Sequence, residues 1–303
     1  MSVRPQAEVT PWQGGRLVRF GPPQVLFGRS YEDERIELAA FGPPGRVCVI
    51  AASGEIAAAA AAAGHTVTAV DVNARQLAYA RDRLAGGESV RGSAESLMTA
   101  ARSLLRPLSP GWRMRRLWPV LQTAGPEEAA AYWARHLDTR VVRWQLAGVL
   151  RPGSFTVRLL TKEFARFIPR RFDDILRARI ARGLARHGMR DNRFAWRLLS
   201  GEDLPGWSPA AVDPDAITWL AVDVATHLES VPAGHYDAVA LSNVLDGAPP
   251  EYGARLRVAV RRAVRPGGAV VLRSLAEPAP GDEGLAAEDA AMIWGSVTTR
   301  WGG

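Results

Sequence analysis

The stretch VCVIAASGEIAAAAAAAGHTVTAVDVN, residues 47–73, constrains the fold more than any other part of the sequence. It opens with a continuous apolar run, turns at Gly54, passes through an alanine-rich segment ended by Gly64, and closes with a second apolar run that reaches Asp71. Buried parallel strands have such continuous apolar runs, and two parallel strands need a helical crossover between them. The stretch therefore predicts a strand, a helix and a second strand, the repeating unit of a doubly wound α/β sheet.

The same pattern returns near the C-terminus after a long interruption. Apolar runs at 217–223 and 237–246 predict a third and a fourth strand, residues 250–264 have the spacing of a helix, and a Pro-Gly-Gly turn within 265–275 leads into another strand. Between 93 and 200 the sequence instead has helical spacing with several tryptophans and many arginines. We therefore expect an α/β, Rossmann-like fold that carries a large helical insertion.

This pattern divides the chain into three parts. They are an N-terminal arm with the first half of the Rossmann-like domain (1–88), a helical insertion or cap (89–216) and the second half of the domain (217–303). Alternatively, SVRGSAES at 89–96 is the third strand, although it has a single strong apolar residue. Ahead of the first strand, residues 26–41 have helical spacing, and a Gly-Pro-Pro-Gly sequence ends that predicted helix.

Composition limits the class of protein. Lys and Arg number 38 against 31 Asp and Glu, which gives a formal charge of +7 and raises the hypothesis of nucleic-acid binding, although the distribution of the charge argues against a nucleic-acid partner. Almost all of the basic residues are arginines, and the excess of basic over acidic residues lies between 102 and 197, so the positive charge belongs to one segment. The single cysteine, Cys48, lies in a predicted buried strand and excludes a disulfide framework. We find no signal peptide and no apolar run of about 20 residues, so we expect a cytoplasmic protein.

The strand ends indicate the ligand. Asp71 follows the second strand, where a carboxylate suits ribose hydroxyls, and Gly54 removes a side chain where a ligand approaches the backbone. The turn has one glycine rather than the three of a dinucleotide fingerprint. Glu55 at the start of the next helix is expected to repel a pyrophosphate. A nucleoside ligand without phosphates is favoured, and S-adenosylmethionine is such a ligand.

The later strands agree with that ligand. Asp223 with Val224 follows the third strand, where an adenine amino group is expected, and Ser242-Asn243 follows the fourth. Together with the turn residues Ala52 and Ser53, these segments predict the class I fold of S-adenosylmethionine-dependent transferases. The insertion would emerge beside the ligand and form a cap that excludes water and shapes the acceptor pocket. A subdomain that only packs or oligomerises is the alternative.

Several longer motifs extend this interpretation. The sequence contains FGRSYEDERIELAAF (27–41), VIAASGEIAAAAAAAGHTVTAVDVNARQL (49–77), GHYDAVALSNVLDGAPPE (234–251) and VRPGGAVVLRSL (264–275). These resemble the bacterial S-adenosylmethionine:diacylglycerol 3-amino-3-carboxypropyltransferases of betaine-lipid synthesis. The chain is shorter than those lipid enzymes, and its length is similar to that of the aminocarboxypropyltransferase type that alkylates a phenol in nocardicin antibiotic synthesis.

The resemblance implies an activity and further site residues. It implies transfer of the 3-amino-3-carboxypropyl group of S-adenosyl-L-methionine, a co-substrate, to a phenol or hydroxyl oxygen, with release of methylthioadenosine. A diacylglycerol acceptor and ordinary methyl transfer are the alternatives. The family's Asp-x-Asn-x-x-Gln element stands here as Asp71, Val72, Asn73 and Gln76, which the resemblance assigns to cofactor binding.

An oxygen acceptor needs a base. We take Tyr31, Glu32 and Asp33 as first candidates, because a segment before the first strand can fold over the ligand, and Asp246 as a further one. The alternative for the Glu32-Asp33 pair is a solvated acidic turn, and Asp246 could instead cap a loop. His227 is a weaker candidate, because surface loops often carry histidines.

The partners remain open in part. We expect a small-molecule acceptor, whose carboxylate cap arginines could hold, although a membrane-facing or merely solvated arginine face at 167–188 is also compatible with the sequence. Nucleic-acid binding and a catalytically inactive adenosyl-binding module remain competing hypotheses. The five histidines are dispersed and Cys48 has no partner, so we expect no metal site.

Overall fold

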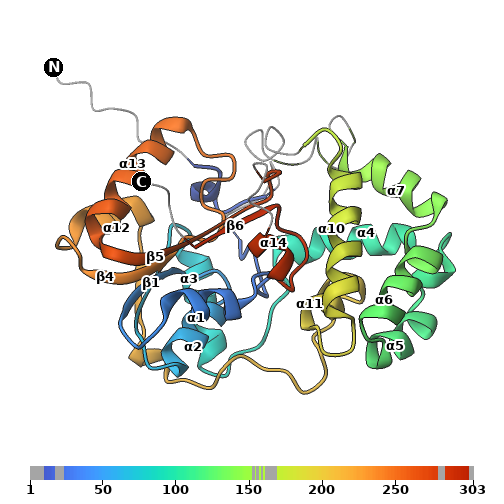
Figure 1. Cartoon of the computed structure of the whole chain (residues 1–303), viewed down its shortest axis with the longest axis horizontal. Helices are drawn as coiled ribbons and strands as arrows, with labels where there is room; N and C mark the ends of the chain where they lie inside the picture. Colours follow the sequence, from blue (N-terminus) through green and yellow to red (C-terminus); the bar gives the residue numbers. More distant parts are fainter. Residues whose placement is uncertain are drawn as a thin grey trace.

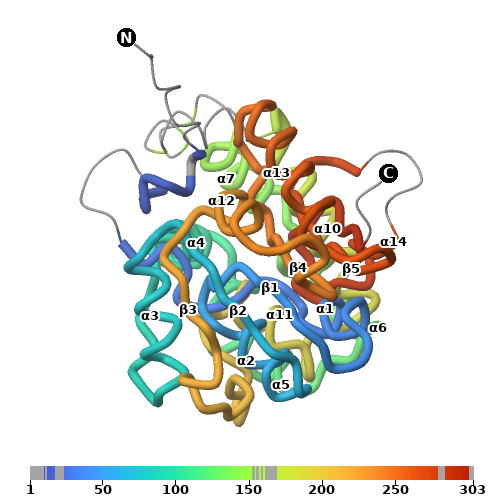
Figure 2. The backbone as a smooth tube through the Cα atoms, turned by 90° about the vertical axis from the view of Figure 1, so that its left-hand side faces the viewer, coloured from blue at the N-terminus to red at the C-terminus, as the bar shows by residue number. Residues whose placement is uncertain are grey.

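A computed structural model describes residues 10–17, 24–151, 154, 157, 160, 169–278 and 284–299. Its centre is a six-stranded sheet with the order β3-β2-β1-β4-β5-β6. The first five strands are parallel, β6 pairs antiparallel with β5, and Figure 2 shows β3 to β5 in this order across the view. The strands are β1 (Arg46–Ile50), β2 (Thr66–Asp71), β3 (Thr218–Ala221), β4 (Tyr236–Ala240), β5 (Val264–Ser274) and β6 (Ser296–Thr298).

Helices cover both faces of the sheet because the strands are apolar on both sides. Val47 and Val49 of β1 pack into one core with Ile56 and Leu77, whereas Cys48 points into a second core on the opposite face. The first face carries α1 (Glu34–Phe41), α2 (Glu55–Ala62) and α3 (Ala74–Leu84), and the second carries α12 (Val224–Ser230) and α13 (Pro250–Ala263). These layers confirm the predicted α/β, Rossmann-like sheet.

The described residues of 93–199, which we call the cap, are mostly helical, follow α3 in the connection from β2 to β3 and lie beside the sheet (Figure 1). Their apolar faces bury a separate core that includes Leu117, Trp133 and Trp196. The segment 89–96 forms no strand, because helix α4 begins at Ser93. The cap helices are α4 (Ser93–Leu105), η2 (Pro110–Trp112), α5 (Met114–Thr123), α6 (Pro126–Tyr132), η3 (Trp133–Leu137), α7 (Arg140–Leu150), α10 (Phe172–His187) and α11 (Arg193–Leu199).

The structure corrects one predicted helix and adds two elements. The helix predicted over 26–41 begins only at Glu34, where Asp33 caps α1 by accepting a hydrogen bond from the backbone N–H of Arg35. Helix α14 (Gly284–Glu288) was not predicted, and neither was strand β6, which pairs with β5 and extends the sheet. In the described part of the chain, the helices are too short or too polar to cross a membrane.

Candidate active site

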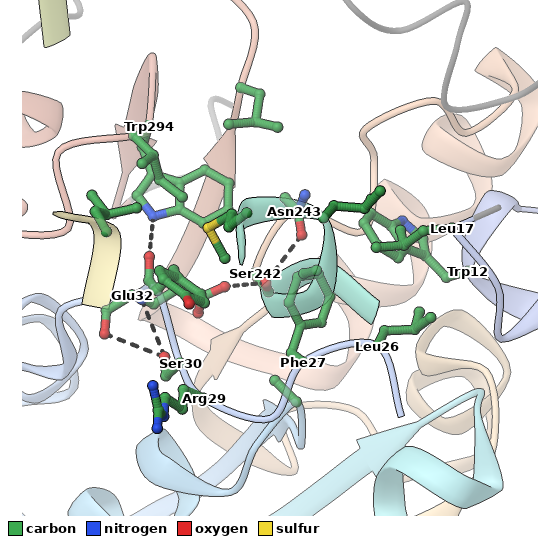
Figure 3. Close-up of a pocket in the computed structure, with 18 of the residues that line it drawn as sticks. Trp12, Leu17, Leu26, Phe27, Arg29, Ser30, Glu32, Ser242, Asn243 and Trp294 are labelled. Atoms are coloured by element: carbon green, nitrogen blue, oxygen red, sulfur yellow. Dashed lines mark hydrogen bonds between the residues drawn. The ribbon is translucent and has the colours of Figure 1, made fainter. Parts of the chain in front are cut away.

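A cavity of about 450 Å³ opens at the carboxyl ends of the parallel strands, between the sheet and the cap. Polar residues line its sheet side, whereas apolar cap residues form much of the rest, among them Leu97, Met98, Leu105, Trp133, Leu176 and Ile180. The predicted site residues that line it are Tyr31, Glu32, Ala52, Asp71, Val72, Asn73, Gln76, Asp223, Val224, Ser242 and Asn243. Figure 3 shows part of this lining, with Glu32 directed toward Ser242.

The cavity lies at the point where the strand order reverses. Strands β1 and β4 are neighbours, and their connections run in opposite directions across the sheet, which is where α/β folds bind ligands. Ala52 after β1 has a φ of 42° and Ser242 after β4 has a φ of 52°. Both values lie in the left-handed region that non-glycine residues avoid, and such strain gathers at functional sites. The two strained residues flank the cavity.

Acidic groups at the ends of β2 and β3 face the cavity. Asp71 accepts a hydrogen bond from the backbone N–H of Asn73 at 2.8 Å, and burial raises the pKa of its carboxyl to about 7. Asp223 caps α12 by accepting from the N–H of Thr226 at 3.0 Å, and the hydroxyl of Tyr252 donates to its other oxygen at 2.6 Å. The backbone N–H of Ala52 also donates to Asp71. A carboxylate has about four lone-pair sites, so a ribose hydroxyl could still donate to this group, which titrates near neutral pH.

We predict that adenosyl ligands bind more weakly as the pH falls. Ribose hydroxyls donate to the ionised carboxylate, so a ligand bound to Asp71 must displace the proton that occupies it below a pKa of about 7. The Kd of methylthioadenosine, which has no group titrating in this range, should rise about tenfold from pH 8 to pH 6 by calorimetry. The Asp71→Asn variant should give a flat profile; a wild-type profile that is equally flat contradicts this role.

Residues 26–32, which we call the strap, line the cavity as irregular chain with several bends. Side chains of other elements satisfy their backbone groups. The amide oxygen of Gln76 accepts from the N–H groups of Leu26 and Phe27 at 2.8 and 3.1 Å, and the Glu95 carboxylate accepts from Gly28 and Arg29 at 3.0 and 3.2 Å. The strap is therefore fixed by side-chain partners rather than by a helix or a sheet.

The strap carbonyls are held in the same way. The Tyr79 hydroxyl donates to Gly28 O at 2.6 Å, Arg197 donates to Ser30 O at 2.5 Å, and the indole N–H of Trp294 donates to Tyr31 O at 2.8 Å. These donors come from α3, α11 and the segment before β6. The strap thereby holds the Glu32 side chain against the end of β4, where Ser242 donates to it.

We predict that Gly28→Ala destabilises the protein by about 2 kcal/mol. A Cβ at this position would lie 1.9 Å from the carbonyl oxygen of Val90 and 3.0 Å from the amide nitrogen of Gly92, both backbone atoms. Urea unfolding measures the change. Gly148→Ala in α7 is the control, since nothing lies within 4 Å of its added methyl, and its stability should be unchanged or slightly higher. If the two variants are equally stable, the close packing of Gly28 against the backbone of Val90 and Gly92 is contradicted.

Glu32, a predicted catalytic residue, is one of the carboxylates that line the cavity. Its side chain is buried, lines the cavity and accepts a hydrogen bond from the hydroxyl of Ser242. Burial raises the pKa of Glu32, while the guanidinium of Arg273, 3.7 Å away, opposes that rise. Burial also raises the pKa of the Tyr31 hydroxyl, which therefore stays protonated at neutral pH. Of these two cavity residues, Glu32 is the one that can accept a proton.

Four predicted site residues do not line the cavity. Asp33 caps α1 and bonds to Arg35 and to the N–H of Ala290, and Asp246 accepts from Ser274 Oγ at 2.6 Å. In the structure these carboxylates hold neighbouring backbone and side-chain groups outside the cavity lining, and a catalytic role for them stays a prediction. Ser53 and Gly54 also miss the cavity, because the turn directs them toward α3: Arg83 donates to Ser53 O, and a Cβ on Gly54 would meet Ala80 O at 3.1 Å.

Two electrostatic expectations also need correction. Glu55 was expected to repel a pyrophosphate, but its buried carboxylate pairs with Arg83 and Arg197, each at 2.9 Å, and does not line the cavity. Those two arginines compensate its charge. His227 was expected on a surface loop, but it is buried in α12 and hydrogen bonds to the Tyr236 hydroxyl at 2.6 Å. Tyr236 begins β4, so His227 lies at the opposite end of the sheet from the cavity.

The sequence interpretation missed several residues of the site. Glu95 and Arg102 on α4 were read only as part of the helical insertion, yet one fixes the strap and the other lines the cavity. Tyr252 lines the cavity as well and holds Asp223. The one available signal was the glycine pair Gly28 and Gly92, since neither tolerates a Cβ where the strap meets α4.

In the ranges that the structure describes, no group of three or more His, Cys, Asp or Glu side chains has an arrangement that could hold a metal ion. Burial raises the pKa of the Cys48 thiol to about 12, which keeps it unreactive at neutral pH. Comparisons with protein-family models, with curated proteins and with solved structures found no match to this chain.

Proposed function

We propose that this chain is a transferase that uses S-adenosyl-L-methionine and moves its 3-amino-3-carboxypropyl group to an oxygen of a small-molecule acceptor. One observation carries the proposal. Asp71, Asp223 and the Ser242-Asn243 pair, which end three strands of one sheet, line the same cavity as Glu32 and the apolar cap. A cavity of about 450 Å³ is in the range of small-molecule sites, roughly 300–1,000 Å³.

The charges of the lining fit this co-substrate. The carboxylates of Glu32, Asp71 and Asp223 face a ligand that carries a cationic sulfonium and an ammonium group. Asp71 supplies an acceptor for ribose hydroxyls. The β1–α2 turn presents Ala52 rather than a row of free N–H groups, because the N–H of Gly54 already bonds to Ala51 O at 2.7 Å. A pyrophosphate would lack its usual donors there.

The residues would divide the work as follows. When bound, the sulfonium supplies an electrophilic carbon and a neutral thioether leaving group. Glu32 takes the proton of the acceptor hydroxyl, and the Ser242 hydroxyl orients that carboxylate through its hydrogen bond. The cap excludes water from the transfer through its apolar side chains. The strap fixes Glu32 opposite the strand ends, so the proton acceptor needs no rearrangement.

The extent of apolar lining favours a second acceptor class. Side chains such as Leu97, Leu105 and Ile180 offer no hydrogen bonds, so a diacylglycerol could occupy this side of the cavity instead of a phenol. In either case the leaving nucleoside is methylthioadenosine. Methyl transfer on the same scaffold would leave S-adenosylhomocysteine.

Identification of the spent nucleoside tests the proposal. The protein is incubated with S-adenosylmethionine and, in parallel, with 4-hydroxyphenylacetate, with tyrosol or with dioleoylglycerol in detergent micelles. We expect methylthioadenosine with one acceptor at least, at a rate above the acceptor-free control. If S-adenosylhomocysteine is the product, a methyl group has been transferred, and the proposed transfer of the 3-amino-3-carboxypropyl group is wrong. If calorimetry shows binding of NAD but no binding of S-adenosylmethionine, the proposed co-substrate is wrong as well.

A further inference from the structure

Arg102 of α4 is a buried cation on the cavity wall. Its side chain is 5% exposed and lines the cavity. Its guanidinium donates to uncharged acceptors, namely the carbonyls of Arg197 and Leu198 at 3.4 and 3.2 Å and the Thr99 hydroxyl at 2.9 Å. Among the described residues, no carboxylate forms an ion pair with it. A buried charge without a counter-ion is costly in a folded protein.

The other arginines of the cavity lining differ in this respect. Arg29 pairs with Asp203 at 2.9 Å, and Arg177 pairs with Asp138 at 2.8 Å and with Asp174. Burial lowers the pKa of Arg102, and the positive charges of Arg106, Arg91 and Arg29 lower it further. The cavity therefore holds an arginine whose charge is opposed by its surroundings and is matched by no acid of this chain that the structure describes.

The surroundings of Arg102 are apolar. Leu97, Met98, Ala101 and Leu105 line the cavity from the same helix, and Leu198 and Leu199 line it from α11. The guanidinium of Arg102 thus lies among apolar side chains of the cavity wall, where an ion pair is much stronger than in water. A planar carboxylate matches its remaining donors, because arginine binds carboxylates through paired N–H groups.

We propose that Arg102 binds a carboxylate of a ligand inside this cavity. The inference rests on the proposed function, in which two ligands carry that group: the methionyl tail of S-adenosylmethionine and an acidic acceptor. In both cases Arg102 acts as a binding residue that fixes one end of the ligand relative to Glu32. It gains its missing counter-ion only when the ligand is present.

Binding measurements on matched variants test this inference. Arg102→Gln removes the charge and Arg102→Lys keeps it without the planar fork. Arg106→Gln is the control, because Arg106 ends the same helix, donates to a carbonyl, Ser200 O, and does not line the cavity. Thermal unfolding checks that each variant folds. If Arg102→Gln fails to fold, Arg102→Lys replaces it, and at least a fivefold weaker carboxylate affinity is then expected.

The first arm tests the co-substrate as the carboxylate source. Calorimetry compares S-adenosylmethionine with its decarboxylated form, which lacks only the carboxylate. If the tail is the partner, the wild type prefers S-adenosylmethionine, and Arg102→Gln binds it at least tenfold more weakly while binding the decarboxylated form unchanged. Arg106→Gln should retain the wild-type preference.

The second arm tests the acceptor as the source. With methylthioadenosine saturating, the wild type should bind 4-hydroxyphenylacetate at least tenfold more tightly than tyrosol, its alcohol counterpart, and Arg102→Gln should lose this preference. The inference stands if either arm shows the loss. It is overturned if folded Arg102→Gln binds S-adenosylmethionine and 4-hydroxyphenylacetate as tightly as the wild type does. Failure of the proposed function is a different result, since it would appear as no binding of S-adenosylmethionine by the wild type.

Discussion

Replacing Glu32 with glutamine should lower kcat by a factor of about 100 to 10,000, the contribution of a general base. The amide keeps the size of the side chain and can still accept the hydrogen bond from Ser242, so the cavity retains its shape. It cannot accept the proton of the acceptor hydroxyl. The rate of methylthioadenosine release with the acceptor that supports turnover measures the effect, and the Kd of methylthioadenosine should change by less than threefold.

The neighbouring carboxylate supplies the control for this prediction. Asp33→Asn alters a residue one position away that caps α1 and does not line the cavity. Its kcat should stay within threefold of the wild type. Asparagine caps a helix as well as aspartate does, so the stability cost should be no more than about 1 kcal/mol, from the lost ion pair with the exposed Arg35. If Glu32→Gln keeps more than a tenth of the wild-type kcat, Glu32 is not the base.

Replacing Arg273 with methionine should destabilise the fold by about 3–5 kcal/mol. This side chain is fully buried and joins three carboxylates: it contacts Glu37 and Asp289, the latter at 2.9 Å, and lies 3.7 Å from Glu32. We call these four residues the Arg273 cluster. Burial raises the pKa of Glu37 to about 7 and also raises the pKa of Asp289, although Arg273 opposes both shifts. Without the guanidinium, the carboxylates would be buried and uncompensated.

The effect should depend on pH in a definite direction. The folded-state pKa values of Glu37 and Asp289 lie above their unfolded values, and loss of Arg273 raises them further. Their protonated forms then favour folding, so the deficit of the variant should shrink as the pH falls from 8 to 5. Arg265→Met on the same strand is the control, because its pair with Asp237 is exposed, and it should cost less than 1 kcal/mol. Equal costs in urea unfolding would contradict the prediction.

The sheet was predictable because each strand is marked by residues within the strand itself and at its ends. Continuous apolar runs gave β1 to β5, and the acids and glycines at their ends gave the turns. Strand β6 has three residues, Ser296–Thr298, which is too short for a period to be visible. In the cap, helical spacing is continuous over residues 126–150, but α6 passes into a π-helical turn that ends at Leu137, and α7 begins only at Arg140.

The site was harder to predict because much of it depends on distant residues. Asp71, Asp223 and Ser242 were accessible from sequence, since each simply follows a strand. The strap was read as a helix because its residues have helical spacing, yet its N–H groups bond to Gln76 and Glu95, which are far away in the chain. Local periodicity does not record such partners. The correct placement of Asp33 and Asp246 likewise depended on which backbone groups the fold brings to them.

The way in which the strap is anchored limits how this protein could change over evolution. One strap residue, Gly28, is held both by Tyr79 of the sheet domain and by Glu95 of the cap, and Ser30 is held by Arg197 from the last cap helix. Deleting or exchanging the cap would therefore release the segment that carries Glu32, even if the sheet folded unchanged. The cap and the sheet are therefore not independent modules, because exchanging the cap would also remove contacts that hold the strap.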